Sequence, residues 1–192
     1  IYFSVVSWAI IFYKLIQVQK ANKESERFLA FFWQTKRFDA VSAQIDRFAN
    51  INATIVGKDY SHPKVRLPGS GGSQEIAAWA NRCYIMTPHQ VRRFPEKVDF
   101  LTSAGYLDGR KSRDDLGLRG KGPVAVVTDI GILEPDSSGE LVLTALHPEK
   151  TSQDAIDNTG WPLKVSGNLR ETDKLKENEL RILREELDPT GI

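Results

Sequence analysis

Cysteine is nearly absent from this sequence, which carries one thiol, Cys83, in 192 residues. A single thiol can form neither an internal disulfide nor a multi-thiolate metal centre. Because Cys83 begins an apolar stretch, we predict that it is a small core residue. The three histidines, His62, His89 and His147, lie far apart, each beside a proline, and lack the spacing of metal ligands. We therefore expect no bound metal, and we expect the histidines to hydrogen-bond within turns.

An excess of charge of either sign is also lacking. The sequence contains 26 Lys and Arg against 25 Asp and Glu, which gives a formal net charge of +1. Because nucleic-acid recognition normally needs a concentrated cationic face, we expect no nucleic-acid partner. Hydrophobic residues make up 41% and charged residues 27% of the chain, values typical of soluble globular proteins, which excludes global disorder.

A long apolar run is present at the start of the chain. Residues 1–18, "IYFSVVSWAIIFYKLIQV", carry one charge, at Lys14, and an almost wholly polar stretch follows. As a helix this run would be about 27 Å long, close to the roughly 30 Å of a bilayer core. The cations that follow it place the downstream part in the cytoplasm, so we predict a domain anchored to the bacterial inner membrane. The alternative is a helix packed against a soluble core. A chain that starts at Ile1 is compatible with a fragment or a processed product.

Beyond the polar stretch, strand and helix signals alternate. Alternation of this kind predicts an α/β domain, with a hairpin at residues 134–140. We expect strands within residues 43–57 (two short ones), 83–87, 123–129 and 140–147. We expect helices within residues 72–82, 151–160 and 171–189, the second of them capped by Thr151 or Ser152.

A cluster of glycines between a basic extended stretch and a helix is the main candidate for a binding site. Residues without a β-carbon permit left-handed backbone angles and let a ligand approach main-chain N–H groups. The N-terminus of the next helix would favour an anion or a developing oxyanion at the same place. A tight turn without a ligand is the alternative. The cluster lacks the Gly-Lys-Ser/Thr of a phosphate loop and is no dinucleotide fingerprint.

Seven ordered strings in residues 41–192 resemble the C-terminal two-thirds of the β subunit of class I CoA-transferases, the glutaconate CoA-transferase type. They are "AQIDRFANINATIVG", "DYSHPKVRLPGSGGSQEIA", "HQVRRFPEKVDFLTSAGYLDG", "GPVAVVTDIGILEPD", "LVLTALHP", "NTGW" and "REELDP". The resemblance implies an incomplete mixed sheet flanked by helices. It implies transfer of CoA between an acyl-CoA and a carboxylic acid, together with a CoA-transferase α subunit. The coenzyme A thioester would be a substrate, with no other cofactor bound.

The same resemblance implies which residues bind the substrate. The family's glycine-rich loop binds the acyl-CoA thioester and its oxyanion through backbone amides, a role that falls here on Gly69, Ser70, Gly71 and Gly72. Asn50 and Asn52 are expected near the substrate pocket. Two positions depart from the family pattern. Ala49 replaces the usual glycine of a Phe-Gly-Asn turn, which puts the geometry of that turn in question, and Lys58 is an apparent one-residue insertion.

The family's nucleophile has no counterpart in this sequence. In the family a glutamate in a motif such as Glu-Ser-Gly or Ser-Glu-Asn-Gly attacks the acyl-CoA and then carries CoA as a glutamyl thioester. The acids upstream of "AQID" include Glu24 and Glu26, which lack a following glycine. We therefore assign no catalytic residue and expect this chain to be inactive in CoA transfer.

Residues 4–33 are similar instead to the first membrane helix and the following cytoplasmic helix of TolQ/ExbB proton-channel proteins. The two resemblances divide the chain into residues 1–38, a possible membrane segment, and residues 39–192, a CoA-transferase-like domain that lacks its N-terminal part. A genuine fusion and an error of gene assembly both explain a join near Asp39. The alternative function is a membrane-anchored, non-enzymatic binding or scaffold protein.

Overall fold

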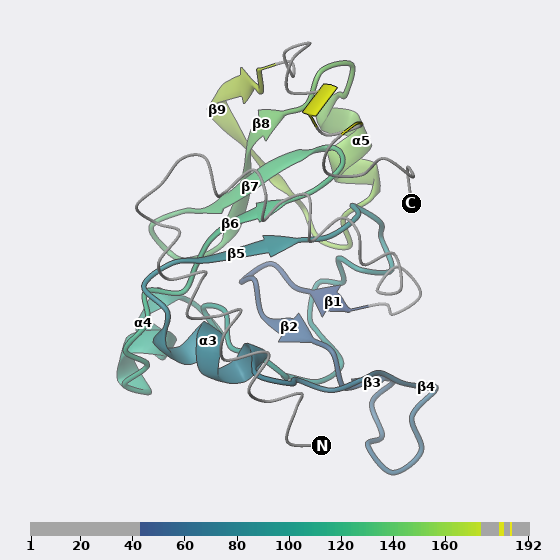
Figure 1. The fold of residues 1–192 in the computed structure, drawn as a ribbon, viewed down its shortest axis with the longest axis vertical. Coiled ribbons are helices and arrows are strands. Elements are labelled where there is room, and N and C mark those ends of the chain that lie inside the picture. The colour runs from purple at the N-terminus through teal and green to yellow at the C-terminus, as the bar shows by residue number, and fades with distance from the viewer. Residues whose placement is uncertain (1–42, 174–180, 183–184, 186–192) are drawn as a thin grey trace. The chain divides into compact units, whose positions relative to one another are not determined.

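The computed structural model describes residues 43–173, 181–182 and 185 (Figure 1). The chain divides into two compact units, and every strand and helix described below belongs to the unit Val41–Lys174. The other unit comprises residues 1–40 and 175–192, of which three residues are described. In it, Arg181 Nη1 lies 3.1 Å from Glu185 Oε2.

The predicted apolar helix of residues 1–18 lies outside the described residues, as does the segment that resembles TolQ/ExbB proteins. Within the described ranges, no helix has the length and hydrophobicity needed to cross a bilayer.

The elements follow the chain in a mixed order of strands and short helices. They are β1 (Gln44–Ile45), β2 (Ile51–Asn52), β3 (Ile55–Val56), β4 (Val65–Arg66), α3 (Ser73–Trp79), β5 (Cys83–Met86), α4 (Arg110–Asp115), β6 (Pro123–Val127), β7 (Gly131–Pro135), β8 (Leu141–Leu146), α5 (Ser152–Asp157) and β9 (Lys164–Glu171) (Figure 1).

Five strands form the main sheet in the order β5-β6-β7-β8-β9. The pairs β5–β6 and β8–β9 are parallel, whereas β6–β7 and β7–β8 are antiparallel. The mixed sheet, the strands within residues 83–87, 123–129 and 140–147, and the hairpin at residues 134–140 were predicted correctly. In β8 the buried and half-buried residues alternate, because successive side chains of a strand point to opposite faces. β6 lies inside the sheet, as its continuous apolar run predicts.

Two smaller antiparallel pairs precede the main sheet. β1 pairs with β2 and β3 pairs with β4, so residues 43–57 contain three very short strands where the sequence predicts two. The hairpin β3–β4 projects at the lower right of Figure 1. Side chains hold the neighbouring turns, since Asp46 accepts the N–H groups of Phe48 and Asn50, and Asn52 accepts the N–H of Thr54.

Three elements, β4, α4 and β9, and one boundary differ from the prediction. α4 and β9 carry no clear periodic signal in the sequence; in β9 six of eight residues are exposed, so no alternation of polarity marks it. Glu171, taken as the start of a C-terminal helix, lies in β9 instead. Apart from three residues, the remainder of that predicted helix lies outside the described part of the chain.

The core lies between the main sheet, α5 and the β1–β2 turn. Its fully buried members include Ile45, Ala49, Phe94, Val126, Leu133, Leu141, Leu143 and Ala155. Trp161 of the "NTGW" string belongs to the same cluster and lies 6.1 Å from the ring of Phe94, centroid to centroid.

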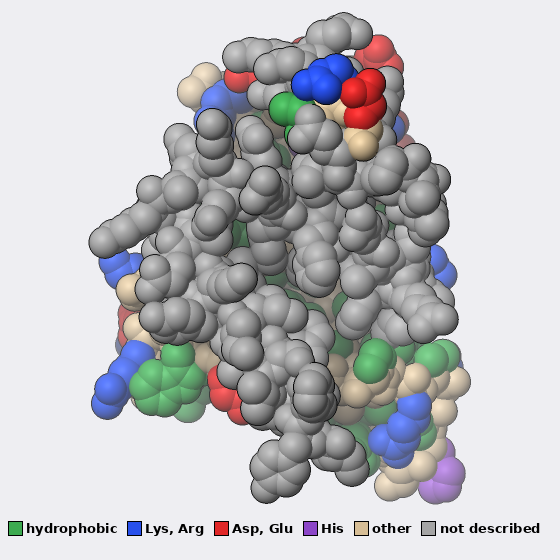
Figure 2. Space-filling model, in the orientation of Figure 1, with side chains coloured by type: hydrophobic (Ala, Val, Ile, Leu, Met, Phe, Trp, Pro, Cys, Tyr) green, Lys and Arg blue, Asp and Glu red, His purple; other side chains and the backbone are tan. Residues whose placement is uncertain are grey.

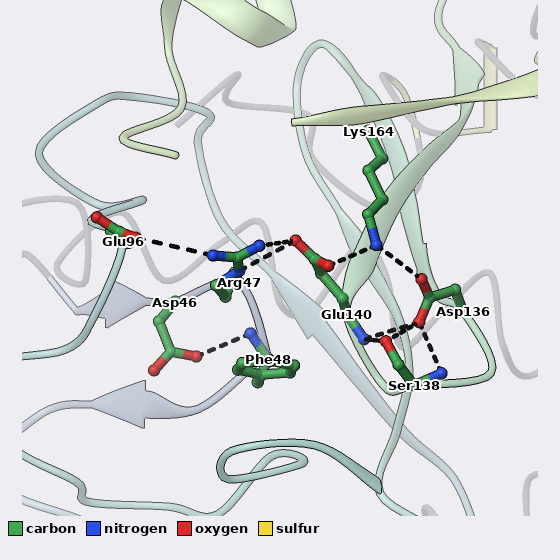
Figure 3. Close-up of polar contacts among 8 residues, drawn as sticks. All are labelled: Asp46, Arg47, Phe48, Glu96, Asp136, Ser138, Glu140 and Lys164. Carbon is green, nitrogen blue, oxygen red and sulfur yellow. Dashed lines mark hydrogen bonds and ion pairs between the residues drawn. The ribbon is translucent and has the colours of Figure 1, made fainter. Parts of the chain in front are cut away.

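A chain of charged contacts ties the β1–β2 turn to the β7–β8 hairpin and to β9 (Figure 3). Arg47 binds Glu140 through Nε and Nη2, and Lys164 Nζ lies 2.6 Å from the second oxygen of Glu140 and 3.2 Å from Asp136 Oδ2. Burial alone would raise the pKa of Asp136, but hydrogen bonds from Ser138 and Lys164 lower it to about 2. Opposite charges therefore stabilise the junction between the small and the main sheet.

Candidate functional site

The glycine loop, residues 69–72, combines left-handed backbone angles with open surroundings. φ is +92° at Gly69 and +51° at Gly71, a region that other residues rarely adopt. A Cβ built on Gly69, Gly71 or Gly72 would meet no described atom within 4 Å. Glycine is therefore needed at two of these positions for backbone conformation rather than for packing, and no described residue fills the space beside the loop.

Both ends of the loop are fastened to neighbouring segments. The N–H of Gly69 donates to the carbonyl of Ala53 at 2.7 Å. At the other end the hydroxyl of Ser73, the first residue of α3, lies 2.7 Å from the hydroxyl of Ser103, which is buried. These anchors hold the intervening backbone in place without using its N–H groups.

The N–H groups of Gly71 and Gly72 donate to no residue in the described part of the chain. Gly72 is the N-cap of α3, and no side chain caps it. Unpaired N–H groups at a helix start favour negative charge. The carboxylate of Glu75 occupies the same turn, and a hydrogen bond from Gln74 lowers its pKa. This negative charge opposes any anion at the loop, whereas N–H groups fixed in place favour a carbonyl oxygen that gains charge during a reaction.

Arg113 supports the helix that follows the loop, a role that no sequence pattern predicts. Its guanidinium is buried, which lowers its pKa, and it donates only to backbone carbonyls, among them those of Ala77, Gly105 and Gly120 at 2.5, 2.8 and 2.9 Å. One side chain thus fixes α3 to two distant loops. An arginine in a polar stretch with neighbouring acids carries no local sign of burial.

Asn52 lies next to the loop but uses its amide within the scaffold. The residue is fully buried; Nδ2 donates to Gln44 Oε1 and to the carbonyl of Ile55, and Oδ1 accepts the N–H of Thr54. The turn that it shapes contains Ala53, the acceptor for Gly69. Asn52 therefore positions the base of the loop, and direct contact with substrate stays a prediction.

Asn50 lies in a different place. Its Nδ2 donates to Asp46 Oδ2 and to the carbonyl of Leu107, and its Oδ1 accepts the N–H groups of Gly105 and Leu107 at 3.0 Å. All of its hydrogen-bonding groups are thus occupied. Its predicted role near a substrate pocket is untested.

Asn50 borders a groove of about 640 Å³ whose lining does not include the glycine loop. Acidic side chains outnumber basic ones along it, and burial raises the pKa of Asp46. The lining residues are Asp46, Arg47, Phe48, Asn50, Glu96, Lys97, Val98, Asp99, Phe100, Leu101, Leu107 and Asp108.

Ala49 adopts a left-handed conformation at the position where the resemblance described above implies a glycine. Its φ is +56°, it is fully buried, and its N–H donates to the carbonyl of Asp46 at 2.9 Å. The turn is therefore kept despite the substitution, at a cost of about 1 kcal/mol for an alanine in this region.

The remaining candidates have structural roles. The ring of His62 hydrogen-bonds to Asp59 within one turn, as predicted. The prediction was wrong for the other two histidines, because His89 contacts Thr128 and Thr159 and His147 contacts Thr172 and the Thr128 carbonyl, all far away along the chain. Within the described ranges, no three His, Cys, Asp or Glu side chains are grouped to hold a metal ion.

The structure also shows the positions of Cys83 and of two neighbouring arginines. Cys83 is half-buried at the start of β5, and burial raises the pKa of its thiol. Arg93 is buried. Its neighbour Arg92 is exposed and donates to Gln90.

Residues 23–158 match the family described as coenzyme A transferase. The chain is 47% identical over 144 residues to the B subunit of 3-oxoadipate CoA-transferase from Pseudomonas knackmussii, covering 74% of this chain and 55% of that protein. It is 44% identical over 149 residues to the B subunit of glutaconate CoA-transferase from Acidaminococcus fermentans, covering 77% and 55%. The crystal structure of glutaconate CoA-transferase from that organism superposes with a TM-score of 0.72 at 39% identity, covering 85% of this chain and 65% of that one.

The chain therefore spans about half the length of these two curated relatives. The family match begins at residue 23, within the segment that resembles TolQ/ExbB proteins, and that second resemblance stays a prediction.

Proposed function

Because the chain belongs to the coenzyme A transferase family, we propose that it acts as a B-type CoA-transferase subunit whose glycine loop receives the thioester carbonyl of an acyl-CoA. The observation that carries this proposal is the open loop at residues 69–72, anchored at both ends with its central N–H groups unpaired among the described residues.

In this function the N–H groups of Gly71 and Gly72 donate to the carbonyl oxygen of the thioester. That oxygen is neutral in the substrate and becomes an oxyanion when a carboxylate attacks the carbonyl carbon. Donors that are already in place stabilise this charge without reorganisation during the reaction. The start of α3 adds the positive end of a helix dipole, although a short helix makes that contribution small.

The proposal includes a partner. Both curated relatives are B subunits by name, and the chain spans 55% of each, so we assign it the part played by one subunit of a hetero-oligomer with a CoA-transferase α subunit. Because the sequence lacks the family's glutamate motif, the chain contributes oxyanion stabilisation but no nucleophile.

Calorimetric titration of the whole chain with acetyl-CoA tests the loop. Gly71→Val and Gly72→Val should each weaken binding by about tenfold or more, because a branched side chain blocks approach to the N–H groups. Two glycines outside the loop are matched controls. Gly117 has a φ of +66°, like Gly71, and Gly167 has no positive φ, like Gly72; a Cβ on either meets no described atom within 4 Å.

Gly117→Val and Gly167→Val should bind acetyl-CoA as the wild type does. If the loop variants and their controls bind acetyl-CoA with equal affinity, the glycine loop does not take part in binding. An equal loss in all four variants would show that a general effect of replacing glycine by valine, and not blocked access to the loop, weakened binding.

A further inference from the structure

A second feature of the molecule, the hairpin of residues 55–66, concentrates positive charge next to the glycine loop. We name this segment the basic hairpin. Lys58, Lys64 and Arg66 are all exposed. The acid within it, Asp59, is bound to His62 and to the N–H of Ser61. In Figure 2, blue side-chain atoms of Lys or Arg lie over the lower right, where Figure 1 places this hairpin.

The cations of the basic hairpin have no carboxylate partner among the described residues. Arg66 is nevertheless held in place, because its guanidinium donates to the carbonyl of Tyr60 at 3.0 Å and lies 4.8 Å from the centre of the Tyr60 ring. That ring in turn packs against Phe100 at 5.7 Å. On a chain with a net charge of +1, such a cluster is a local excess of positive charge that no carboxylate of the described residues balances.

The hairpin and the glycine loop are two ends of one ribbon. Val56 pairs with Val65, and the antiparallel contacts continue from Leu67 to Thr54 and from Gly69 to Ala53. In an extended chain, the five steps from Lys64 to Gly69 span about 17 Å. Lys64 and Arg66, two residues apart, lie on the same face of the strand. The cations are thus set at a fixed distance from the N–H groups of the loop.

We propose that the basic hairpin binds the phosphate groups of coenzyme A while the glycine loop holds the thioester of the same molecule. This inference rests on the proposed function. In an acyl-CoA the long pantetheine arm separates the thioester from the diphosphate and the 3′-phosphate. A ligand whose carbonyl lies at Gly71 must therefore place its phosphates well away from the loop, as the ribbon does with its cations. The acidic lining of the groove described above would repel these phosphates.

A titration with three probes distinguishes phosphate binding by the basic hairpin from thioester binding by the glycine loop. The probes are acetyl-CoA, acetyl-3′-dephospho-CoA and S-acetylpantetheine. The double variant Lys58→Gln/Lys64→Gln keeps most of each side chain but removes two charges. We expect it to bind acetyl-CoA about tenfold more weakly, since charge-assisted contacts to phosphate are lost, and to bind S-acetylpantetheine as the wild type does. Its affinity for acetyl-CoA should also depend less on salt. Lys111→Gln/Lys121→Gln, with two exposed lysines outside the hairpin, is the matched control.

The proposal is overturned if the hairpin variant and the lysine control bind acetyl-CoA with equal affinity. It is also overturned if the affinities of the hairpin variant for acetyl-CoA and for S-acetylpantetheine fall by the same factor. Loss of affinity in Gly72→Val but not in the hairpin variant would leave the proposed function standing without the hairpin. A loss of affinity for acetyl-CoA in the hairpin variant but not in Gly72→Val would support phosphate binding by the basic hairpin and contradict thioester binding by the glycine loop. A wild-type chain that binds none of the three probes overturns both.

Discussion

His89 is a neutral histidine held inside the fold. It is 2% exposed, its ring lies 4.4 Å from that of Phe94, and its nitrogens face the hydroxyls of Thr128 and Thr159 at 3.3 and 2.9 Å. Burial lowers the pKa of His89 from 6.5 to about 4, and the nearby Asp129 opposes this shift only in part. The unfolded chain therefore binds a proton on His89 at a pH where the folded chain does not.

We predict that the free energy of unfolding falls by about 2 kcal/mol between roughly pH 7 and pH 5 because of His89. A group with a depressed basic pKa loses stability as the pH falls through its unfolded value, and the loss ends near its folded value. Urea denaturation at several pH values measures this slope. His89→Gln should flatten it, whereas His62→Gln, at an exposed position, should keep the wild-type slope. An unchanged slope in His89→Gln would contradict the assignment.

At the scale of single elements, α5 begins at a cap that the sequence predicts and contributes a buried residue to the core. Thr151 Oγ1 accepts the N–H of Asp154, and the Asp154 carboxylate accepts the N–H of Thr151, which is a reciprocal capping box. The helix buries Ala155, and its carbonyl accepts the hydroxyl of Thr159, the residue that faces His89. α5 thus connects the cap, the core and the buried histidine.

We expect Thr151→Val to lower the free energy of unfolding by about 1 kcal/mol, because it removes the capping oxygen but keeps the shape of the side chain. Ser152→Ala changes the next residue, whose hydroxyl makes no hydrogen bond to a described residue, and should cost much less. Thermal or urea denaturation compares the two. Equal destabilisation by both variants would mean that the capping box adds nothing to stability.

At the scale of the whole molecule, the proposed function assigns this chain one part of a two-part chemistry. In that proposal the glycine loop polarises a thioester, whereas the sequence lacks the motif that places a glutamate for attack. Glu24 and Glu26 lie outside the described residues and lack the glycine that follows the family's nucleophile. A carboxylate reaches the required geometry only when its surroundings hold it there.

We therefore predict that the 192-residue chain, even mixed with a CoA-transferase α subunit, forms no glutamyl-CoA thioester and transfers no CoA to an acceptor acid. Residual hydrolysis of acyl-CoA by water is the most that oxyanion stabilisation alone allows. Mass spectrometry after incubation with acyl-CoA and hydroxylamine detects any modified glutamate, with an intact glutaconate CoA-transferase as the positive control. A CoA adduct on Glu24, Glu26 or another glutamate, together with transfer, would refute the prediction.

The local features of this protein could be predicted from its sequence. The apolar runs at residues 123–129 and 140–147, the cap at Thr151 and the glycines before α3 follow from side-chain periodicity, capping chemistry and the absence of a β-carbon. The mixed character of the sheet and the family followed from ordered motifs. β9 and α4 escaped prediction because their exposed faces leave no periodic pattern in the sequence.

Only the tertiary structure decided which polar side chains serve the scaffold and which surfaces stay open. The family resemblance implies that Asn52 is a site residue, yet its amide hydrogen-bonds to Gln44 and Ile55. One of the two anchors of the glycine loop is Ser103, thirty residues from Ser73. Arg113 meets the carbonyl of Ala77 across an even longer stretch of chain. The physical reason is that a polar group taken from water must be paired, and its partner is set by which segments the fold brings together. Local pattern selects the elements, whereas burial and long-range hydrogen bonds decide what each residue does.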